Sequence, residues 1–370
     1  MTRRPSHDRS PGHEPPSDPQ PPPWHTLPEP PGRQLDDLGP QLLDGLYGGL
    51  LIDEEWSVRT ERSFTWWPHR LAQHVTASEP RLAFGDPMIA LHGQSDVVAE
   101  VTAPQERVTG LLADLNRNAT LGAYVWDPAQ RTIGYATSAY LYEGNLGVQE
   151  VLRLALLLGA TEAELVAEAL AAELEGKPAY SSHPTSGPRP VGDDLLNFVG
   201  QIVVPHGEEP SEFIGLVPEA GAALHWAMAS GDDEGFTGEL PYHGDRPAVS
   251  MGAGDAVAIA GPLQTALVRV LATQAHPTYG SGALMLMLLP DHFDEDTAPA
   301  TADALNRAEA TTLTGFPQFG AWCVAAHDPS TLAFATFLPS IIARPGLIGT
   351  MCFYLQLRAA WAREQLADAE

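Results

Sequence analysis

Two stretches of the chain share one order of apolar and polar positions. In each, an amphipathic segment ends in a Leu-Asn-Arg triplet, at residues 115–117 and again at 305–307. A Gly-Ala-aromatic strand follows each triplet, and then come an Asp-Pro turn, a second strand and a long apolar helix. Because such matched order is typical of an internal repeat, the pattern predicts an α+β fold with two tandem copies of one module. Each copy is expected to run helix, strands, helix, strands, helix around an antiparallel sheet.

The first copy is predicted to occupy residues 42–176. Within residues 107–115, apolar side chains recur at steps of three and four, which gives one buried helical face. Residues 121–126 and 133–138 are predicted to form an antiparallel pair of strands. The Asp-Pro sequence between these two strands favours a tight turn.

The rest of the first copy is predicted from the same periodicities. Residues 66–75 place apolar side chains at steps of four and are expected to form a short helix. Residues 81–91 are expected to form a strand. Two closing helices are expected at residues 148–158 and 162–175, separated by a capping box that starts at Thr161.

The second copy is predicted to occupy residues 236–370, and its later part matches the first copy best. Its expected elements are a helix at 263–274, a strand at 283–289, paired strands at 320–326 and 331–338, and a closing helix at 347–366. As in the first copy, an Asp-Pro sequence separates the paired strands.

Two further segments lie outside the copies. Residues 1–34 are crowded with proline and bury nothing obvious, so a disordered tail is expected, with a proline-rich docking ligand as the alternative. Residues 177–235 are interpreted as a linker or insert, with strand-like residues at 198–204 and 213–217. Some of this insert is expected to complete the second sheet and some to lie between the modules.

The chain carries a formal net charge of −27, from 47 acidic and 20 basic residues among 370. This charge repels phosphate groups, so nucleic acid and membranes are not expected as partners, and a basic partner is favoured. The two cysteines are too few for a disulfide framework and are expected to be buried free thiols. The proline-rich start lacks the apolar core of a signal peptide, so a cytoplasmic location is expected.

No cofactor, metal ion or catalytic residue is predicted, because each candidate motif lacks a required residue. The acidic run at 291–296 lacks the glycine and the terminal glutamate of a calcium loop. His69 and His74 are five residues apart, which turns them to different faces of a helix. Residues 280–282 lack the first glycine of a nucleophile elbow, and residues 252–254 lack the third glycine of a dinucleotide-binding loop.

Large aromatic side chains are the remaining candidates for a binding surface. Trp66 and Trp67 are adjacent, so on a helix they point to different sides, and one of them is expected to meet solvent or a partner. Trp226 lies in the insert and is the third residue predicted to bind a partner.

The order of elements in both copies resembles the type III secretion chaperone fold and its YbjN-like relatives. The resemblance covers residues 42–176 and 236–367. The residues that carry it are 65–68, the triplets at 115–117 and 305–307, and the strands at 122–126 and 320–324. It implies a non-enzymatic protein that holds another polypeptide through paired modules and exposed apolar grooves. Two fused copies would then form a pseudo-dimeric monomer or a homodimer.

The leading hypothesis is therefore an adaptor or chaperone-like protein with a protein or peptide client, for which the acidic charge favours basic segments. A second hypothesis is a regulatory or sensory protein that binds a small ligand in the crevice between the two modules. A third is an enzyme with an unfamiliar site at His69, His74 or residues 291–296.

Overall fold

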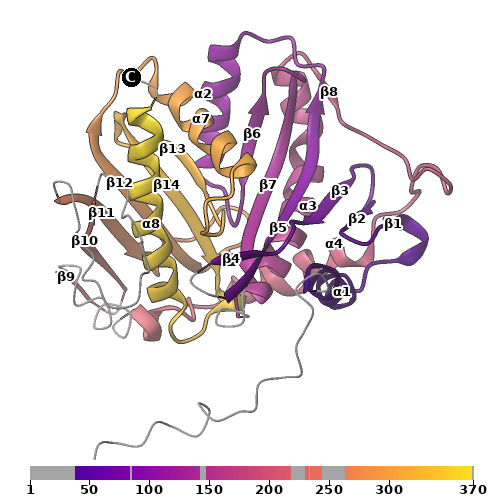
Figure 1. The fold of residues 1–370 in the computed structure, drawn as a ribbon, viewed down its shortest axis with the longest axis horizontal. Helices are drawn as coiled ribbons and strands as arrows, with labels where there is room; N and C mark the ends of the chain where they lie inside the picture. The colour runs from indigo at the N-terminus through magenta and orange to yellow at the C-terminus, as the bar shows by residue number, and fades with distance from the viewer. Residues whose placement is uncertain are drawn as a thin grey trace, which may run out of the picture. The chain divides into compact units, whose positions relative to one another are not determined.

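A computed structural model describes most of the chain. The described residues are 38–83, 86–141, 147–217, 230–232, 234–243 and 263–368. They form an α+β fold with two antiparallel sheets (Figure 1). The predicted tail at 1–34 and the predicted partner-binding residue Trp226 lie outside the described residues.

The first sheet lies in the N-terminal half of the chain and is preceded by helix α1 (Leu38–Leu50). Its described strands are β1 (Ser57–Arg59), β2 (Ser63–Trp66), β3 (Gln73–Ala77), β4 (Arg81–Ala83), β5 (Asp86–Ala99), β6 (Ala123–Asp127), β7 (Thr132–Leu141) and β8 (Lys177–Pro178). They are ordered β1-β2-β3-β5-β7-β6, and the short strands β4 and β8 also pair with β5. All of these pairings are antiparallel.

The second sheet lies in the C-terminal half of the chain. Its described strands are β9 (Ser230–Gly231), β10 (Gly235–His243), β11 (Leu263–Leu271), β12 (Gly282–His292), β13 (Ala321–Ala325) and β14 (Asp328–Pro339). They are ordered β9-β10-β11-β12-β14-β13, again with antiparallel pairing throughout.

The two sheets therefore have the same strand order when each is followed along the chain. In both, four strands lie side by side, and the last two strands follow in reversed order. A helix separates the fourth strand from the last pair, namely α2 (Gln105–Asn116) in the first half and α7 (Ala298–Thr311) in the second. A long helix then follows the pair, namely α3 (Val148–Glu173) or α8 (Leu347–Ala367).

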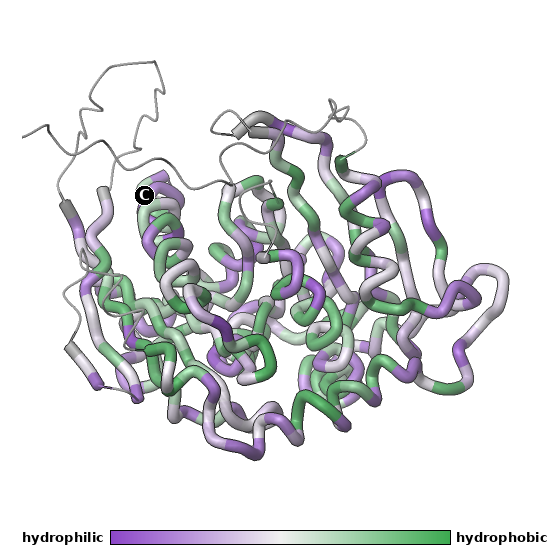
Figure 2. Tube along the Cα trace, turned by 90° about the horizontal axis from the view of Figure 1, so that it is seen from below, coloured by the Kyte–Doolittle hydropathy of each residue, from purple (hydrophilic) through white to green (hydrophobic). Residues whose placement is uncertain are grey.

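Helices cover the sheets and join the two halves. Helix α3 packs on β5 and β7, helix α8 contacts β10 and β11, and helices α2 and α7 contact each other. Side chains from both halves belong to one continuous apolar core, which reaches from Leu43 in α1 to Phe337 in β14. Apolar segments, green in Figure 2, accordingly run through both halves of the molecule.

Most elements predicted from the sequence are confirmed. The helix expected at 107–115 is α2, the closing helix expected at 347–366 is α8, and the two strand pairs are β6 with β7 and β13 with β14. The turn between β6 and β7 is held by the Asp127 carboxylate, which accepts hydrogen bonds from the backbone N–H groups of Ala129 and Gln130 at 2.8 and 3.1 Å.

The helix expected at 66–75 is wrong. Strand β2 ends at Trp66, and strand β3 begins at Gln73. In β3 the side chains of Gln73, Val75 and Ala77 are buried and the two between them are exposed. This alternation has the period of a strand, so the steps of four that suggested a helix were coincidental.

The helix expected at 263–274 is also wrong, because these residues form strand β11. Buried Ala266, Val268 and Val270 alternate with exposed Leu267 and Arg269. Period two with β-branched side chains favours a strand, and the apolar content of the segment had concealed that period.

Three smaller expectations also need correction. The two closing helices of the first half are one helix, α3, and the Thr161 hydroxyl donates to the carbonyl oxygen of Leu157 inside it instead of capping a new helix. Residues 198–204, expected to be strand-like, lie in α4 (Asp194–Phe198), a π-helical turn at Val199–Val203 and α5 (Val204–His206). Residues 213–217 contain a 3₁₀ turn.

Candidate partner-binding surface

The asparagine of each Leu-Asn-Arg triplet fastens a helix to the strand that follows it. The Asn116 side-chain amide donates to the Tyr124 carbonyl oxygen at 2.9 Å and accepts from the Tyr124 N–H at 2.8 Å. Asn306 makes the same two hydrogen bonds to Trp322, at 2.8 and 2.7 Å. All four residues are buried, so these amides satisfy backbone groups that would otherwise be left without partners.

The arginine of each triplet reaches across to the opposite half. Arg117 Nε donates to the carbonyl oxygen of Val324 in β13 at 3.1 Å. Arg307 Nη1 donates to the carbonyl oxygen of Trp126 in β6 at 3.2 Å. The two bonds are reciprocal, because each arginine leaves one half and binds the matching strand of the other.

A second reciprocal pair of contacts lies beside the first. The Thr336 hydroxyl donates to the carbonyl oxygen of Thr120, and the Thr137 hydroxyl donates to the carbonyl oxygen of Gln318, both at 3.1 Å. These four residues are buried, so the junction between the halves is closed to solvent. The repeated motif therefore has an architectural role.

A buried carboxyl group also lies at this junction. Glu162 in α3 accepts a hydrogen bond from the Thr120 hydroxyl at 2.7 Å. Burial raises the pKa of Glu162 to about 7, although the hydroxyls of Thr120, Tyr279 and Tyr135 partly oppose the shift. The Glu162 side chain is almost inaccessible, so it is suited to holding a proton inside the fold and not to meeting a substrate.

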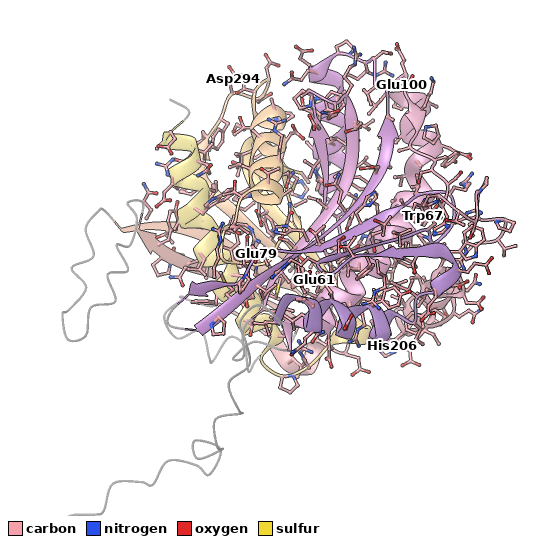
Figure 3. All side chains as sticks on the ribbon, turned by 45° about the vertical axis from the view of Figure 1, so that its right-hand side comes forward. Glu61, Trp67, Glu79, Glu100, His206 and Asp294 are labelled. Carbon is pink, nitrogen blue, oxygen red and sulfur yellow. The ribbon has the colours of Figure 1, made fainter. Side chains whose placement is uncertain are left out.

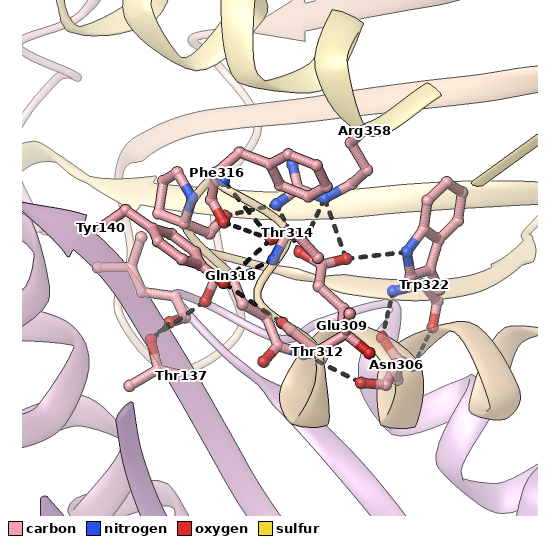
Figure 4. A network of polar contacts seen from close by, with 12 residues as sticks. Thr137, Tyr140, Asn306, Glu309, Thr312, Thr314, Phe316, Gln318, Trp322 and Arg358 are labelled. Carbon is pink, nitrogen blue, oxygen red and sulfur yellow. Dashed lines mark hydrogen bonds and ion pairs between the residues drawn. The ribbon is translucent and has the colours of Figure 1, made fainter. Parts of the chain in front are cut away.

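A polar network lies inside the second half (Figure 4). Arg358 in α8 donates to Glu309 in α7 at 2.6 Å, and the indole N–H of Trp322 donates to the same carboxylate at 3.1 Å. The guanidinium group also lies over the Phe334 ring, 3.8 Å from its centre. Both charged side chains are fully buried, and their contacts join α7, α8 and β13. Removing either charged partner alone would leave a buried charge without its counterion, which is strongly destabilising.

A second repeated motif, His-Pro-Thr-x-Gly, was not recognised from the sequence alone. In both turns the histidine Nδ1 accepts hydrogen bonds from backbone N–H groups two and three residues later. The proton must then sit on Nε2, which donates to the carbonyl oxygen of Ser57 from His183 and of Asn118 from His276. Both histidines therefore hold a turn together, and burial lowers the pKa of His276.

The predicted partner-binding tryptophans Trp66 and Trp67 are both buried, with exposed fractions of 0% and 7%. Trp66 donates its indole N–H to Gln73, and Trp67 donates to the Ser181 hydroxyl, each at 2.9 Å. The expectation that one of them meets solvent is wrong, because neither lies on a helix. Figure 3 shows Trp67 among packed side chains from neighbouring segments.

The polar candidates from the sequence do not converge. His69 lies near Glu164, whereas His74 lies on β3 and its Nδ1 is 2.9 Å from the Thr65 hydroxyl. Asp291, which begins the acidic run, pairs with Arg363 at 2.8 Å. Over the described ranges, no three His, Cys, Asp or Glu side chains are grouped so that they could hold a metal ion.

Both cysteines are buried free thiols, as expected from the sequence. Burial raises the pKa of Cys323 and of Cys352 to about 12. The nucleophilic thiolate form is therefore strongly disfavoured at both positions.

A groove of about 650 Å³ lies between the end of α1 and α4. We call it the Leu51 groove. It is lined by Leu51, Asp53, Trp56, Leu195, Phe198 and the run 189–194. Large apolar side chains are exposed along it, namely Leu51 at 81%, Val191 at 72% and Phe198 at 37%. Contiguous exposed apolar side chains are typical of binding surfaces.

Leu51 also has an unfavourable backbone conformation. Helix α1 ends at Leu50, and Leu51 follows it with a φ of 53°. This left-handed position after a helix is normally taken by glycine, because a Cβ atom is disfavoured there. A leucine at this position therefore costs backbone energy while exposing its side chain, and local strain of this kind concentrates at functional sites.

An arginine fixes the floor of the Leu51 groove. The Arg189 side chain is 9% exposed and pairs with Asp53 at 3.2 Å and with Asp193 at 2.9 Å. It also donates to the Trp67 carbonyl oxygen at 2.9 Å. These bonds hold the run 189–194 against the turn that follows α1, so the walls of the groove are preorganised.

A second groove, of about 550 Å³, lies where the starts of α3 and α8 meet. Its lining comes from both halves: Gly147, Val148 and Val151 on one side, and Phe319 and residues 344–347, 349–351, 353 and 354 on the other. Arg344 crosses it and pairs with Glu150 at 2.8 Å. A Cβ atom added at Gly349 would meet nothing within 4 Å, so that part of the groove is open.

No protein-family model, curated protein or solved structure matches the chain. Among the described residues, no helix combines the length and apolar character that crossing a membrane requires.

Proposed function

We propose that this chain is a non-enzymatic adaptor or chaperone-like protein that holds a segment of another polypeptide in the Leu51 groove. The observation that carries the proposal is Leu51 itself, an 81% exposed leucine in a backbone position that favours glycine. Glycine would cost less backbone energy there, and an exposed leucine beside other exposed apolar side chains supports a role in binding.

The arrangement of the two halves supports the same proposal. The matching strand orders and the reciprocal arginine bonds are what two fused copies of one module would produce. The resemblance to secretion chaperones and YbjN-like proteins then supplies the class of activity, which is holding a polypeptide through paired modules. The buried ionisable clusters at Glu162 and Glu309 are closed to solvent and act within the fold.

Selection from a randomised peptide library against the full chain tests the proposal. We expect enriched peptides to share an apolar anchor, and their affinity for Leu51→Gly to be lower by about tenfold, the effect of losing one buried leucine contact. Glu175→Gly is the matched control, because Glu175 also has a φ of 53° at the end of a helix but does not line the groove.

Two results would contradict the proposal. One is a library selection that enriches no peptide family. The other is a set of peptides that bind wild type, Leu51→Gly and a Val191→Ser/Phe198→Ser double variant with equal affinity, since the Leu51 groove would then not be the binding surface.

The groove between α3 and α8 favours a second candidate function, the binding of a small ligand between the two halves. Both halves line it, and its apolar wall carries Met351 and the half-exposed Phe353. A thermal-shift screen against common metabolites tests this function, because a ligand that binds only the folded state raises the melting temperature. Gly349→Leu would fill the groove and should abolish any such shift.

A further inference from the structure

We infer that the segment held in the Leu51 groove joins an apolar anchor to lysine or arginine side chains. This inference rests on the proposed function and specifies the chemistry of its partner.

The apolar part of the partner follows from the walls of the groove. Leu51 and Val191 stand on opposite segments of the lining, and Phe198 closes one end at the last residue of α4. Ile202 is 46% exposed and lies four residues after Phe198 in a continuous helical run. Residues four apart share a helical face, so Ile202 extends the apolar strip beyond the groove. The strip accommodates more than one apolar side chain.

The basic part follows from the charges around that strip. A short 3₁₀ helix, Glu54–Trp56, lies beside the groove. Together they carry five carboxylates against the single guanidinium group of Arg189, namely those of Asp53, Glu54, Glu55, Asp193 and Asp194. Arg189 is already paired with two of these carboxylates.

The other three carboxylates are available to a partner. Glu54, Glu55 and Asp194 are exposed, and none of them forms an ion pair with another residue in the described part of the chain. A cationic side chain of a bound segment would therefore meet carboxylates for which the described residues provide no competing cation.

Charge and apolar surface would act at different stages of binding. An acidic rim attracts basic segments during encounter and disfavours acidic ones, whereas the apolar strip supplies most of the contact area once the segment is bound. The net charge of −27 acts in the same direction over longer distances. The inference therefore predicts a dependence on salt that a purely apolar groove would not have.

The test uses three fluorescent peptides with the same Leu-Phe-Leu centre and with lysine, serine or glutamate flanks. Their affinities for the full chain are measured by fluorescence anisotropy between about 0.05 and 0.5 M salt, a range over which surface charges become strongly screened. We expect the lysine peptide to bind about tenfold more tightly than the serine peptide at low salt, and the glutamate peptide most weakly. The differences should shrink as salt rises.

A matched pair of variants separates the rim from the overall charge. Glu54→Gln/Glu55→Gln/Asp194→Asn should remove most of the preference for the lysine peptide and leave the serine peptide unaffected. Glu106→Gln/Glu295→Gln/Asp296→Asn removes the same number of exposed charges elsewhere and should leave the preference in place. Residues 295 and 296 are next to Asp294. In Figure 3, Asp294 is well separated from Trp67, whose carbonyl oxygen accepts a hydrogen bond from Arg189 in the Leu51 groove.

The outcomes distinguish this inference from the function on which it rests. If all three peptides bind with equal affinity through Leu51, the inferred partner chemistry is overturned and the proposed function stands. If the two triple variants behave alike, the rim is not the source of the preference and the inference is again overturned. If none of the three peptides binds and the library also enriches nothing, the proposed function itself fails.

Discussion

Glu162 is a carboxyl group that folding surrounds with hydroxyl groups. Thr120 donates to it, and Tyr135 and Tyr279 lie close enough for their hydroxyls to lower its pKa. No arginine or lysine of the described ranges is paired with it, so burial dominates and favours the neutral form. Burial is the main cause that raises the pKa values of Tyr124, Tyr135 and Tyr279. The charge of the ionised Glu162 carboxylate raises them further.

The raised pKa of Glu162 predicts that stability falls as pH rises. A carboxyl group whose pKa is raised from 4.5 in the unfolded chain to about 7 in the folded one stabilises the fold fully only at low pH. As the pH rises from 4.5 to about 7, this contribution is lost, and the free energy of unfolding falls by up to about 3 kcal/mol. Urea denaturation of wild type and Glu162→Gln at several pH values measures it. A slope over this pH interval that is the same in both proteins would contradict the assignment to Glu162.

Leu51 makes a prediction in which stability and binding move in opposite directions. Leu51→Gly relieves a left-handed backbone position and removes little buried surface, so it should raise the free energy of unfolding by about 1 kcal/mol. Glu175→Gly should give a similar gain for the same reason, and urea denaturation of both variants provides the comparison. A loss of stability in Leu51→Gly would mean that the side chain is packed in the fold, and the Leu51 groove would lose its main support.

The Leu51 groove could not be predicted from aromatic side chains or ligand motifs. It is defined by where α1 ends and by which face of residues 189–198 is left uncovered. One local signal was present, since the Gly48-Gly49-Leu50-Leu51 sequence places leucine where a helix stop favours glycine. The prediction that Trp66 or Trp67 is exposed failed because it assumed a helix at residues 66–75, and that helix does not form.

In each half of the molecule, a glycine comes directly before the first strand of the last hairpin. Gly122 precedes β6, and Gly320 precedes β13. A Cβ atom at Gly122 would lie 2.7 Å from the carbonyl oxygen of Ala136, and one at Gly320 would meet the Ala335 carbonyl oxygen even more closely. Ala136 and Ala335 are the residues paired with the first strand positions, Ala123 and Ala321. The glycine that precedes each of these strands is thus required by close backbone approach.

Substitution of this glycine should therefore be costly. Gly122→Ala is expected to lower the free energy of unfolding by about 2 kcal/mol, because the new methyl group meets backbone that cannot move freely. Gly110→Ala in α2 is the control, since a Cβ atom there meets nothing within 4 Å and alanine favours a helix. Thermal denaturation of the two variants should show opposite shifts, and equal shifts would contradict the steric explanation.

The success of prediction differed between elements for a physical reason. Helix α2 was predictable because it buries one face at helical spacing. The hairpins β6–β7 and β13–β14 were predictable because an Asp-Pro turn separates two short runs of strand-forming residues, and their longer strands are buried on both faces. The segments that form β2, β3 and β11 were misread because their apolar residues also satisfy helical spacing over a few positions. Such segments become strands because they pair with neighbouring strands. β3 pairs with β5, and β11 pairs with β12, and local residue patterns do not reveal these pairings.

The two halves unfold as one unit if their shared core is as continuous as the packing indicates. Arg117→Ala removes a hydrogen bond from a charged group to the buried Val324 carbonyl oxygen and should cost about 2 kcal/mol of that common stability. Arg107→Ala, near the start of α2, removes only exposed ion pairs with Glu173 and Glu175 and should change little. Chemical denaturation followed by circular dichroism measures both. Similar losses in both variants would contradict a special role for the arginine that crosses the junction.

The place of the run 189–198 in the chain has a consequence for stoichiometry. A symmetric pair of separate chains would present every surface twice, whereas the run 189–198 belongs to a connecting segment that occurs once between β8 and β9. Because that segment supplies most of the lining around Leu51, each molecule should saturate with a single equivalent of its ligand. Isothermal titration calorimetry should therefore give about one bound ligand per protein chain, with no second, weaker binding phase.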